Sequence, residues 1–460
     1  MSSTETKGQQ FGLFSTIAMI AGIVIGSGIF FKTADVLNKT GGSVMFGVLA
    51  FCIAGISIVF GSLTVAELAT RSDGSGGIIS YADAFVGKWF SSAVGWLNVF
   101  IYVPAVISIE SYVCGMYCCQ LFGIENSLTN NFLVGGVCFL FFFAMNLVPR
   151  FGGVFQNISA VLKFLPLVAF IIYGIWKGDS SAIHFSELST ACRSLGWLAA
   201  VSPIAFAFEG WLVATSISSE IKNPKKNIPL AFTIAPLVIL LTYVLYFVGM
   251  SFYLGPEEIL KHGNGHVQIA AAKFLGKYGG NIIMTFIIVS VMGALNGNIM
   301  GALRFVTPLA EKRMFPGSGA FLKDRGKLCA PKAAFVLVFV LSTAFAVVSY
   351  LLKLTEAIDS SFDFTEFAIA CCYFLYILLY AQVIRLKREG KIKSAFRGYV
   401  CPVMAIIGAM VMVSGGVMRG LEFVRPFGYF MAFTLVVIVT GAIYGGKASD
   451  KEGVTQNGNG

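Results

Sequence analysis

Long apolar runs recur along the chain, and they constrain its fold more than any other feature. Stretches of about 18 residues or more, each long enough to cross a hydrocarbon core about 30 Å thick, return from residue 11 to residue 445. Inside such a core every backbone polar group must bond within the chain, so only helices and closed barrels can span it. Barrel strands alternate apolar and polar residues, and the runs at 282–289 and 435–439 do not. The sequence therefore predicts an all-α integral membrane protein.

The apolar runs divide into twelve predicted membrane spans. Hydrophobic residues make up 57% of the chain and charged residues only 12%, whereas a soluble domain carries about 25% charge. The first run is too long for the apolar region of a signal peptide, so we interpret it as a membrane helix. The predicted spans are 11–39, 43–69, 90–121, 131–149, 153–176, 195–218, 229–253, 279–306, 333–352, 363–385, 399–418 and 425–445.

Lysine and arginine are distributed unequally between the two sides of these spans. Of the 33 basic residues, 22 flank the spans on the side of the termini, 10 lie on the opposite side and Lys163 falls within a span. Because basic residues accumulate in cytoplasmic loops, we expect both termini in the cytoplasm and the protein in the cell membrane. The net charge of +10 then reflects topology and anionic lipid headgroups, and no nucleic acid partner is predicted.

No linker separates soluble domains along the chain. We expect a cytoplasmic N-terminus at 1–10, five-helix repeats at 11–177 and 195–385, two further helices at 399–445, and a disordered cytoplasmic tail at 446–460. Most of the ten cysteines lie inside apolar runs, where cysteine behaves as a small hydrophobic residue. We expect no structural metal and no cofactor, and no obligate protein partner is evident.

Two predicted spans contain residues that interrupt a helix at the depth of the membrane. Residues 22–30 read GIVIGSGIF and residues 206–211 read FAFEGW. Glycine costs about 1 kcal/mol in a helix relative to alanine, and the backbone groups that a break releases must be buried in protein or line a cavity. Such breaks at corresponding places in two halves are the best sequence indication of a transporter's substrate site. Packing of Gly22 and Gly26 against another helix is the alternative.

An amino acid matches the electrostatics of such breaks. The N-terminal end of a half-helix attracts a carboxylate, and the carbonyl groups left open at a C-terminal end attract an ammonium group. A nucleotide site is excluded, because no strand, turn and helix surround the glycines.

Four motifs in order resemble the amino acid–polyamine–organocation superfamily, and most closely its L-type amino acid transporter-like branch. They are GSGIF at 26–30, AEL at 66–68 followed by GSGG at 74–77 and Tyr81, FAFEGW at 206–211, and EIKNPKKNIP at 220–229. The resemblance covers residues 11 to 445. It implies a five-plus-five inverted repeat with discontinuous helices 1 and 6 plus two further helices, alternating access, and exchange or proton-coupled uptake.

The resemblance also implies roles for individual residues. The substrate carboxylate would meet the backbone of Ser27 and Gly28, beside Gly26, and the ammonium would meet carbonyl groups near Ile23, Val24 and Phe206. Phe206 would close over the ligand as a gate, next to Ala207 and Gly210, although simple apolar packing remains an alternative. Lys163 would stand where sodium-coupled relatives bind sodium, and its alternative is a structural amine that caps the carbonyl groups of a broken helix.

Three acids in or beside the spans have more than one interpretation. Glu110 serves either a helix-packing hydrogen bond or the site, and Glu67 is an interfacial structural partner. Glu209 departs from the family pattern, and a buried carboxylate needs a partner. The candidates for this partner are free backbone N–H groups, a proton, Lys163 and a cationic substrate. Asn296 and Asn298 lie on a glycine-rich stripe, which favours close packing over ligand contact.

The sequence as a whole favours a transporter of small neutral amino acids. A channel would need a charged ring or a repeated filter, and an enzyme would need a catalytic constellation, neither of which is evident. A non-transporting amino acid sensor, or a permease for cationic amino acids or polyamines, remains the alternative. Protons and membrane lipid are the other expected partners.

Overall fold

The computed structural model describes residues 12–26, 28–72, 77–184, 186–187, 195–208, 210–211, 221–322, 330–358, 362–421 and 424–457. Ten helices in these ranges are long and apolar enough to cross a membrane. Two further apolar helices, within Leu13–Val24 and Gly196–Ala207, are shorter. These two fall in the first and sixth predicted spans. The prediction of an all-helical protein with about twelve spans, the first and sixth discontinuous, is confirmed.

The helices follow the predicted spans closely, and several spans consist of two elements. Span one is α1 (Leu13–Val24) and α2 (Gly28–Lys39), and span six begins with a 3-10 turn (Gly196–Ala200) and α10 (Val201–Ala207). The other spans are α3 (Val44–Ala69), α5 (Lys88–Leu97) with α6 (Val103–Phe122), α7 (Leu128–Met145), α8 (Pro149–Leu162) with α9 (Phe164–Lys177), α11 (Pro224–Leu254), α13 (His266–Glu311), α14 (Lys332–Leu354), α15 (Phe364–Arg388), α16 (Cys401–Leu421) and α17 (Val424–Asn457). Short helices α4 (Ile78–Phe85) and α12 (Pro256–His262) connect them.

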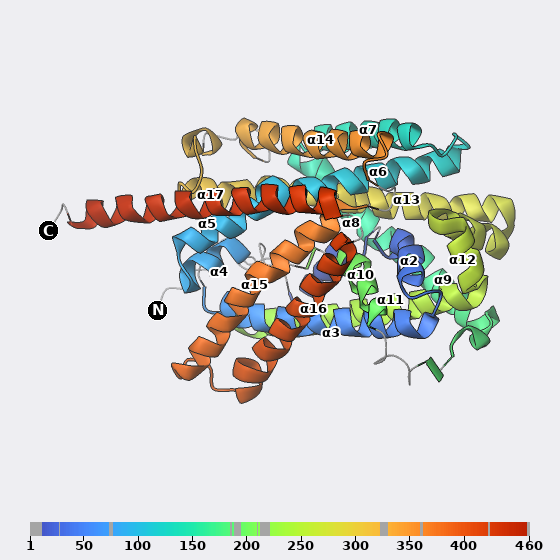
Figure 1. Ribbon diagram of the computed structural model, residues 1–460, viewed down its shortest axis with the longest axis horizontal. Coiled ribbons are helices and arrows are strands. Elements are labelled where there is room, and N and C mark those ends of the chain that lie inside the picture. Colours follow the sequence, from blue (N-terminus) through green and yellow to red (C-terminus); the bar gives the residue numbers. More distant parts are fainter. Residues whose placement is uncertain are drawn as a thin grey trace.

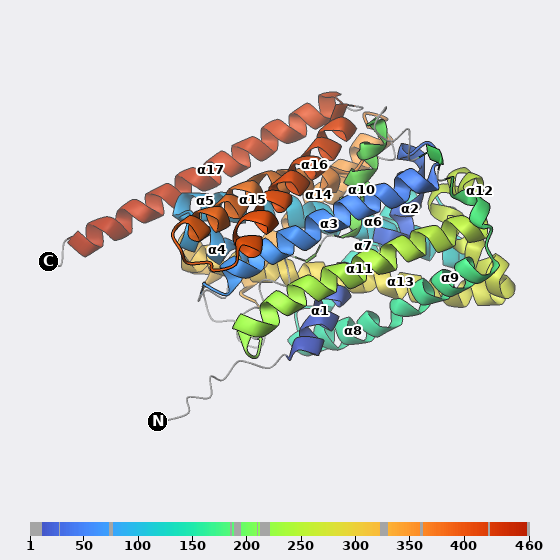
Figure 2. The ribbon, with the colours of Figure 1, turned by 90° about the horizontal axis from the view of Figure 1, so that it is seen from below.

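Corresponding spans of the two halves pack against each other at the centre of the bundle. Helix α2 contacts α10, α3 contacts α11, and α6 contacts α13. Figures 1 and 2 show α3 and α11 running side by side along the length of the molecule. Helices α16 and α17 are added outside this core, with α16 on α3 and α15, and α17 on α5. This packing places both interrupted spans in the interior, where released backbone groups can be buried in protein.

The periphery of the bundle is apolar, as a lipid-facing surface requires. Helices α14 and α17 bury only a minor share of their apolar windows, and the large side chains that they expose include Val336, Val340, Val347, Leu435 and Val436. In a soluble protein such helices would be an aggregation surface. In a bilayer they contact acyl chains, which explains the excess of hydrophobic residues.

The last helix extends beyond the last predicted span. Helix α17 continues to Asn457, through most of the segment 446–460. The residues at 447–452 are lysine, alanine, serine, aspartate, lysine and glutamate. Their polarity predicts a lack of burial, but it does not prevent a helix already formed in the membrane from extending by one hydrogen bond per residue.

Candidate functional site

The first span breaks between Val24 and Gly28. Helix α1 ends at Val24, and Ile25 has an extended backbone with φ −70° and ψ 97° while its N–H still donates to the Ala21 carbonyl at 2.8 Å. Gly26 is also non-helical, and α2 begins at Gly28. Ser27 lies outside the described residues. The C-terminal end of one half-helix and the N-terminal end of the next therefore lie within a few residues of each other.

The sixth span breaks directly after Ala207. Helix α10 ends there, and Gly210 has a φ of 103°, a left-handed conformation that side chains other than glycine rarely adopt. Glycine at 210 thus permits the chain to turn away from the helix axis. Glu209 lies outside the described residues, so its role stays a prediction.

The two breaks touch each other through Gly28. A Cβ atom on Gly28 would lie 2.6 Å from the Cα of Ala207 and 3.2 Å from Cδ1 of Phe206. Such distances leave no room for a side chain, so glycine is required where α2 meets the end of α10. A Cβ atom on Gly26 would lie 3.0 Å from the Cβ of Ala294, which is also tight.

A small cavity lies where the breaks meet, and we call it the break cavity. Its volume is about 20 Å³ of space for the centre of a water molecule, so it holds little more than one water. It is lined by Val24, Gly26, Gly28, Tyr102, Val106, Glu110, Phe206, Ala207, Gly210, Ala294 and Asn298. An amino acid does not fit without movement of the walls.

The hydroxyl group of Tyr243 joins the two breaks. Tyr243 lies in α11 and is fully buried, and its oxygen is 3.1 Å from the carbonyl oxygen of Val24 and 2.8 Å from that of Ala207. These carbonyl groups come from the C-terminal ends of α1 and α10. One polar atom therefore reaches the open end of both half-helices, which is the arrangement that an ammonium group would need.

Lys163 is fully buried beside the same break. Its ammonium group donates a hydrogen bond to the carbonyl oxygen of Gly22 in the last turn of α1. Lys163 stands at the junction of α8 and α9, where Pro166 has no N–H to donate to the preceding turn. The helix of span five is therefore interrupted at Lys163, between α8 and α9. The contact with Gly22 is the one expected of an amine that caps a broken helix, and it leaves the coupling role untested.

Glu110 and Asn298 meet on the wall of the break cavity. The amide nitrogen of Asn298 is 3.0 Å from each carboxylate oxygen of Glu110, and Glu110 is 4% exposed. Asn296, by contrast, joins a packing network with Asn146 and Gln156.

Most of the predicted site residues converge, and the sequence analysis missed others. The residues that line the cavity are Val24, Gly26, Gly28, Phe206, Ala207 and Gly210. Ile23 lies in the last turn of α1. Tyr243 was missed because nothing local distinguishes it from other aromatic residues of an apolar span. Tyr102 and Val106 were missed too. They precede Glu110 by eight and four residues, a spacing that places all three on one helix face.

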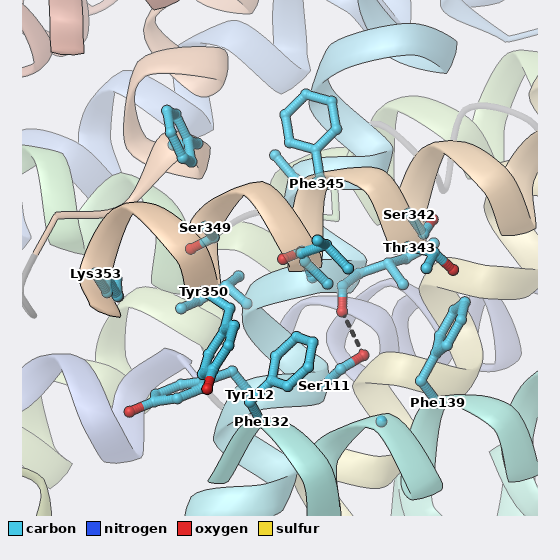
Figure 3. Close-up of a pocket in the computed structure, with 18 of the residues that line it drawn as sticks. Ser111, Tyr112, Phe132, Phe139, Ser342, Thr343, Phe345, Ser349, Tyr350 and Lys353 are labelled. Atoms are coloured by element: carbon cyan, nitrogen blue, oxygen red, sulfur yellow. Dashed lines mark hydrogen bonds between the residues drawn. The ribbon is translucent and has the colours of Figure 1, made fainter. Parts of the chain in front are cut away.

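A larger cavity lies on the opposite face of α6, and we call it the lateral cavity. It has a volume of about 190 Å³ and is lined by α6, α7, α14 and residues 362–364. Figure 3 shows aromatic side chains such as Phe132, Phe139 and Tyr350 around it, together with the hydroxyl groups of Ser342 and Thr343. It shares no lining residue with the break cavity, so its size alone does not make it the substrate site.

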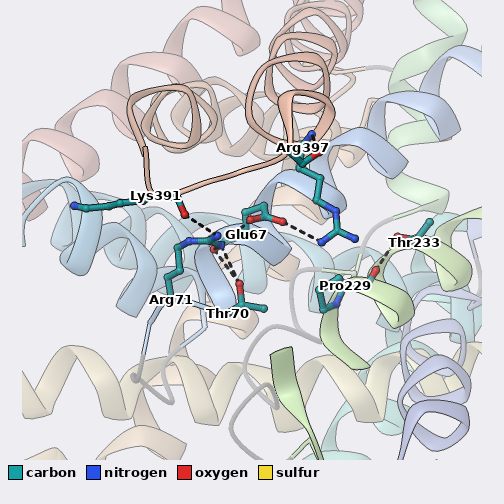
Figure 4. A network of polar contacts seen from close by, with 8 residues as sticks. Glu67, Thr70, Arg71, Pro229, Thr233, Lys391 and Arg397 are labelled. Carbon is teal, nitrogen blue, oxygen red and sulfur yellow. Dashed lines mark hydrogen bonds and ion pairs between the residues drawn. The ribbon is translucent and has the colours of Figure 1, made fainter. Parts of the chain in front are cut away.

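Glu67 belongs to a polar network at the end of α3. One carboxylate oxygen is 2.6 Å from Arg71 and the other is 3.4 Å from Arg397, which precedes α16. Figure 4 shows these contacts together with that between Arg71 and the backbone of Lys391. The network ties α3 to the segment between α15 and α16. These ion pairs agree with a structural role for Glu67.

Comparison with known proteins agrees with this architecture. The amino acid permease family matches residues 11–445. The serine/threonine exchanger SteT of Bacillus subtilis is 28% identical over 88% of this chain and 90% of its own length. The human large neutral amino acids transporter small subunit 2 is 27% identical over 74% of this chain and 66% of its own. The mouse b(0,+)-type amino acid transporter 1 is 27% identical over 66% of this chain and 64% of its own.

These matches confirm the resemblance to the amino acid–polyamine–organocation superfamily and its L-type-like branch. The matching family and relatives are transporters, and the family match includes both helix breaks and all twelve spans. The chain belongs to the amino acid permease family and is a multi-pass membrane transporter, not an enzyme.

Proposed function

We propose that the protein transports small neutral amino acids by alternating access, without sodium, by exchange or by proton-coupled uptake. The observation that carries this proposal is that the carbonyl groups of Val24 and Ala207 both face the hydroxyl of Tyr243, beside the start of α2. An amino acid presents one ammonium and one carboxylate a short distance apart. The two half-helix ends offer complementary partial charges for both groups.

The proposed binding mode assigns one end of the amino acid to each kind of helix end. The carboxylate meets the N–H groups at the start of α2, near Gly26, Ser27 and Gly28. The ammonium group meets the carbonyl groups near Ile23, Val24 and Ala207. Phe206, which lines the break cavity, closes over the ligand. Because the cavity holds little more than one water, entry of an amino acid requires Phe206 or the half-helices to move, as alternating access demands.

The proposed substrate class rests on the relatives and on the size of the site. The printed name of SteT describes a serine/threonine exchanger, and the name of the human relative refers to large neutral amino acids. The break cavity is narrow, and at two of its glycines, Gly26 and Gly28, there is no room for a side chain. These features favour a small neutral substrate and an exchange mode.

The independence from sodium rests on Lys163. Its buried amine donates to the Gly22 carbonyl, at a helix end that would otherwise attract a cation. We assign the coupling role to Lys163 and Glu209, with a proton as the coupled ion.

A cationic amino acid or a polyamine is the second candidate, and Glu110 is the observation in its favour. In the sequence, the absence of another acid beside the sixth-span motif, which itself contains Glu209, favours neutral substrates. In the structure, Glu110 lines the break cavity. A carboxylate at that position could pair with a second positive charge. Asn298 already donates to both of its oxygens, which is why we keep the neutral substrate first.

Uptake into proteoliposomes tests the proposed function. Labelled serine, leucine, arginine and putrescine would be offered to vesicles that are empty or preloaded with serine, with and without sodium and a pH gradient. We expect serine uptake that is unchanged without sodium and faster into preloaded vesicles. An absolute sodium requirement would contradict the proposal. Binding of serine without any uptake would identify a sensor, and uptake confined to arginine or putrescine would establish the second candidate.

Glu110→Gln separates the two substrate classes. The variant keeps the shape and the hydrogen bond with Asn298 but loses the charge. We expect serine uptake to stay within about tenfold of the parent, the equivalent of one hydrogen bond. Glu258→Gln, at an exposed position in α12, is the matched control. Selective loss of arginine uptake in the Glu110 variant would instead favour the cationic class.

Tyr243→Phe tests the link between the two breaks. Phenylalanine keeps the ring packed against Phe208, whose centroid is 5.0 Å away, and removes the hydroxyl that reaches Val24 and Ala207. We expect transport to fall about tenfold, the equivalent of one buried hydrogen bond. Tyr246→Phe is the control, because it lies one turn along α11 and its hydroxyl has no hydrogen-bond partner among the described residues. Equal effects of the two variants would remove Tyr243 from the mechanism.

The orientation in the membrane and the extent of the repeats belong to the same proposal. We place both termini in the cytoplasm, the repeats at 11–177 and 195–385, and the additional helices at 399–445. The excess of basic residues on the terminal side supports this orientation. A C-terminal tag that could be labelled from outside intact cells would overturn it.

A further inference from the structure

The wall of the lateral cavity between α7 and α14 consists of two stacked aromatic pairs with a small residue between them. Phe132 of α7 stacks on Tyr350 of α14 with ring centres 4.5 Å apart, and Phe139 stacks on Phe339 with ring centres 5.6 Å apart. Gly136 lies between the two phenylalanines of α7, and a Cβ atom there would meet no atom within 4 Å. The rings therefore hold the two helices together on either side of a space that no side chain fills.

Two hydroxyl groups at the inner end of the lateral cavity lack a hydrogen-bond partner. Ser342 and Thr343 lie near the middle of α14 and line the cavity (Figure 3). Their hydroxyl oxygens are buried without a partner among the residues that the structure describes, and Ser342 is 2% exposed. Ser111 of α6, by contrast, donates to the carbonyl oxygen of Ile107 at 2.6 Å, as serine in a helix commonly does. Because an unpaired buried polar group is unfavourable, a ligand that offered a hydrogen bond here would bind more tightly.

The opposite end of the lateral cavity is basic. Lys353 lies in the last turn of α14, and its ammonium nitrogen is 5.4 Å from the centre of the Tyr112 ring. It is the only basic residue among the described residues that line this cavity. Asp363 lines the cavity too, but its carboxylate is 3.1 Å from the ammonium group of Lys32, which compensates its charge. The end of the cavity at Lys353 therefore suits an anionic group.

The distance between the two ends sets the length of a ligand that could reach both. Ser342 and Lys353 are separated by eleven residues of one helix, which correspond to a rise of about 16 Å. Figure 3 shows Lys353 at one end of the lined space and Ser342 with Thr343 at the other. Apolar cavities of about 150 Å³ stay dry and bind small apolar molecules. The lateral cavity, at about 190 Å³, is therefore large enough for a slender apolar body.

A second hollow connects the basic end of the lateral cavity with polar loops, and we call it the polar vestibule. It has a volume of about 320 Å³ and shares Tyr112, Leu128 and Lys353 with the lateral cavity. Its other lining residues include Asn126, between α6 and α7, and Asn264, between α12 and α13. A ligand with one charged end can therefore enter from the aqueous side of these loops, with its apolar body first.

We infer that the lateral cavity is a second ligand site, which binds a medium-chain carboxylate with a hydrogen-bonding group at the far end of its chain. The carboxylate lies at Lys353, the chain passes between the aromatic pairs, and the far group meets the hydroxyls of Ser342 and Thr343. A phospholipid fits less well, because the end of an acyl chain offers these hydroxyls no polar atom. The inference does not rest on the proposed transport function, since the two cavities share no lining residue.

Binding of labelled ω-hydroxydecanoate to the full chain in lipid nanodiscs is the test. Nanodiscs without protein give the background from partition into lipid. We expect saturable binding that is about fivefold tighter than that of decanoate, which lacks the far hydroxyl group. An excess of serine should displace neither compound. Serine exchange is measured separately, so a protein that binds ω-hydroxydecanoate as expected without exchanging serine would refute the proposed function alone.

Variants at the two ends of the cavity distinguish the two contacts. Ser342→Ala with Thr343→Val keeps the shape of the wall and should weaken ω-hydroxydecanoate about fivefold while leaving decanoate unchanged. Lys353→Met removes the charge and should weaken both carboxylates at least about tenfold, but not decanol. Lys332→Met, at the exposed start of the same helix, is the matched control and should bind all three compounds like the parent.

A variant that fills the cavity completes the test. Gly136→Leu places a side chain in the unfilled space and should abolish binding of all three compounds, whereas Gly153→Leu, whose Cβ also meets no atom within 4 Å, should not. A thermal unfolding scan reports the fold of each variant. Absence of saturable binding, displacement by serine, or equal affinity of the parent for decanoate and ω-hydroxydecanoate would overturn the inference. So would unchanged binding in a folded Gly136→Leu or in the Lys353 variant.

Discussion

Gly28→Leu is expected to abolish amino acid binding while the protein remains folded. The Cβ of any side chain at this position would lie 2.6 Å from the backbone of Ala207, so α2 and α10 must move apart. That movement separates the N–H groups of α2 from the carbonyl group at the end of α10. Overpacking of this kind costs about 1–3 kcal/mol, and we expect affinity to fall at least about a hundredfold, the equivalent of about 2.7 kcal/mol.

Serine binding to the purified variant measures the effect, and size-exclusion chromatography with a thermal unfolding scan reports the fold. Gly153→Leu in α8 is the matched control, since a Cβ there meets no atom within 4 Å. Gly26→Leu should also lose binding, because its Cβ would meet Ala294 at 3.0 Å. Normal affinity in Gly28→Leu would refute the site at the breaks.

Lys163→Ala is expected to slow transport by roughly a hundredfold and to weaken serine binding much less. Removal of the amine leaves the Gly22 carbonyl buried without its donor, and an unpaired buried group costs about 1–3 kcal/mol. It also removes the amine to which we assign the coupling role. The first loss weakens the attachment of α1 to span five, and the second removes the proposed coupling group. Neither loss removes a protein group that we assign to substrate binding.

Initial rates of serine exchange, compared with equilibrium binding, separate these effects. Lys177→Ala at the exposed end of the same span is the control. An unchanged rate in Lys163→Ala would remove the coupling role, and the appearance of sodium-stimulated uptake would support it. Equal losses of rate and affinity would indicate that Lys163 is only a structural cap.

The helix breaks could be predicted from the sequence because their cause is local. Gly26, Gly28 and Gly210 interrupt helices by their own conformational freedom and small size. Composition and apolar length likewise predict the twelve spans. The extent of α17, which continues to Asn457, does not follow from composition, because the residues past the apolar run are polar.

The contacts that complete the site could not be predicted, because they join distant segments. Nothing in the sequence near Lys32 indicates its carboxylate partners, Asp363 and Glu366, because they follow more than 300 residues later. Tyr243 is one of 16 tyrosines, and only the fold brings its hydroxyl to both breaks. The capping contact of Lys163 with Gly22 was foreseen as one of two alternatives, but the location of its carbonyl partner was not.

The hydroxyl of Tyr243 has a consequence for the return of the carrier without cargo. It carries a single proton and faces two carbonyl acceptors, so it can donate to only one of them at any moment. An ammonium group brings three protons and can supply both acceptors at once. In the loaded site both carbonyl groups therefore have a hydrogen-bond donor. In the empty site one of them lacks a donor whenever α1 and α10 rearrange. Under the proposed function, loaded carriers should reorient faster than empty ones, which makes strict one-for-one exchange the natural mode of this architecture.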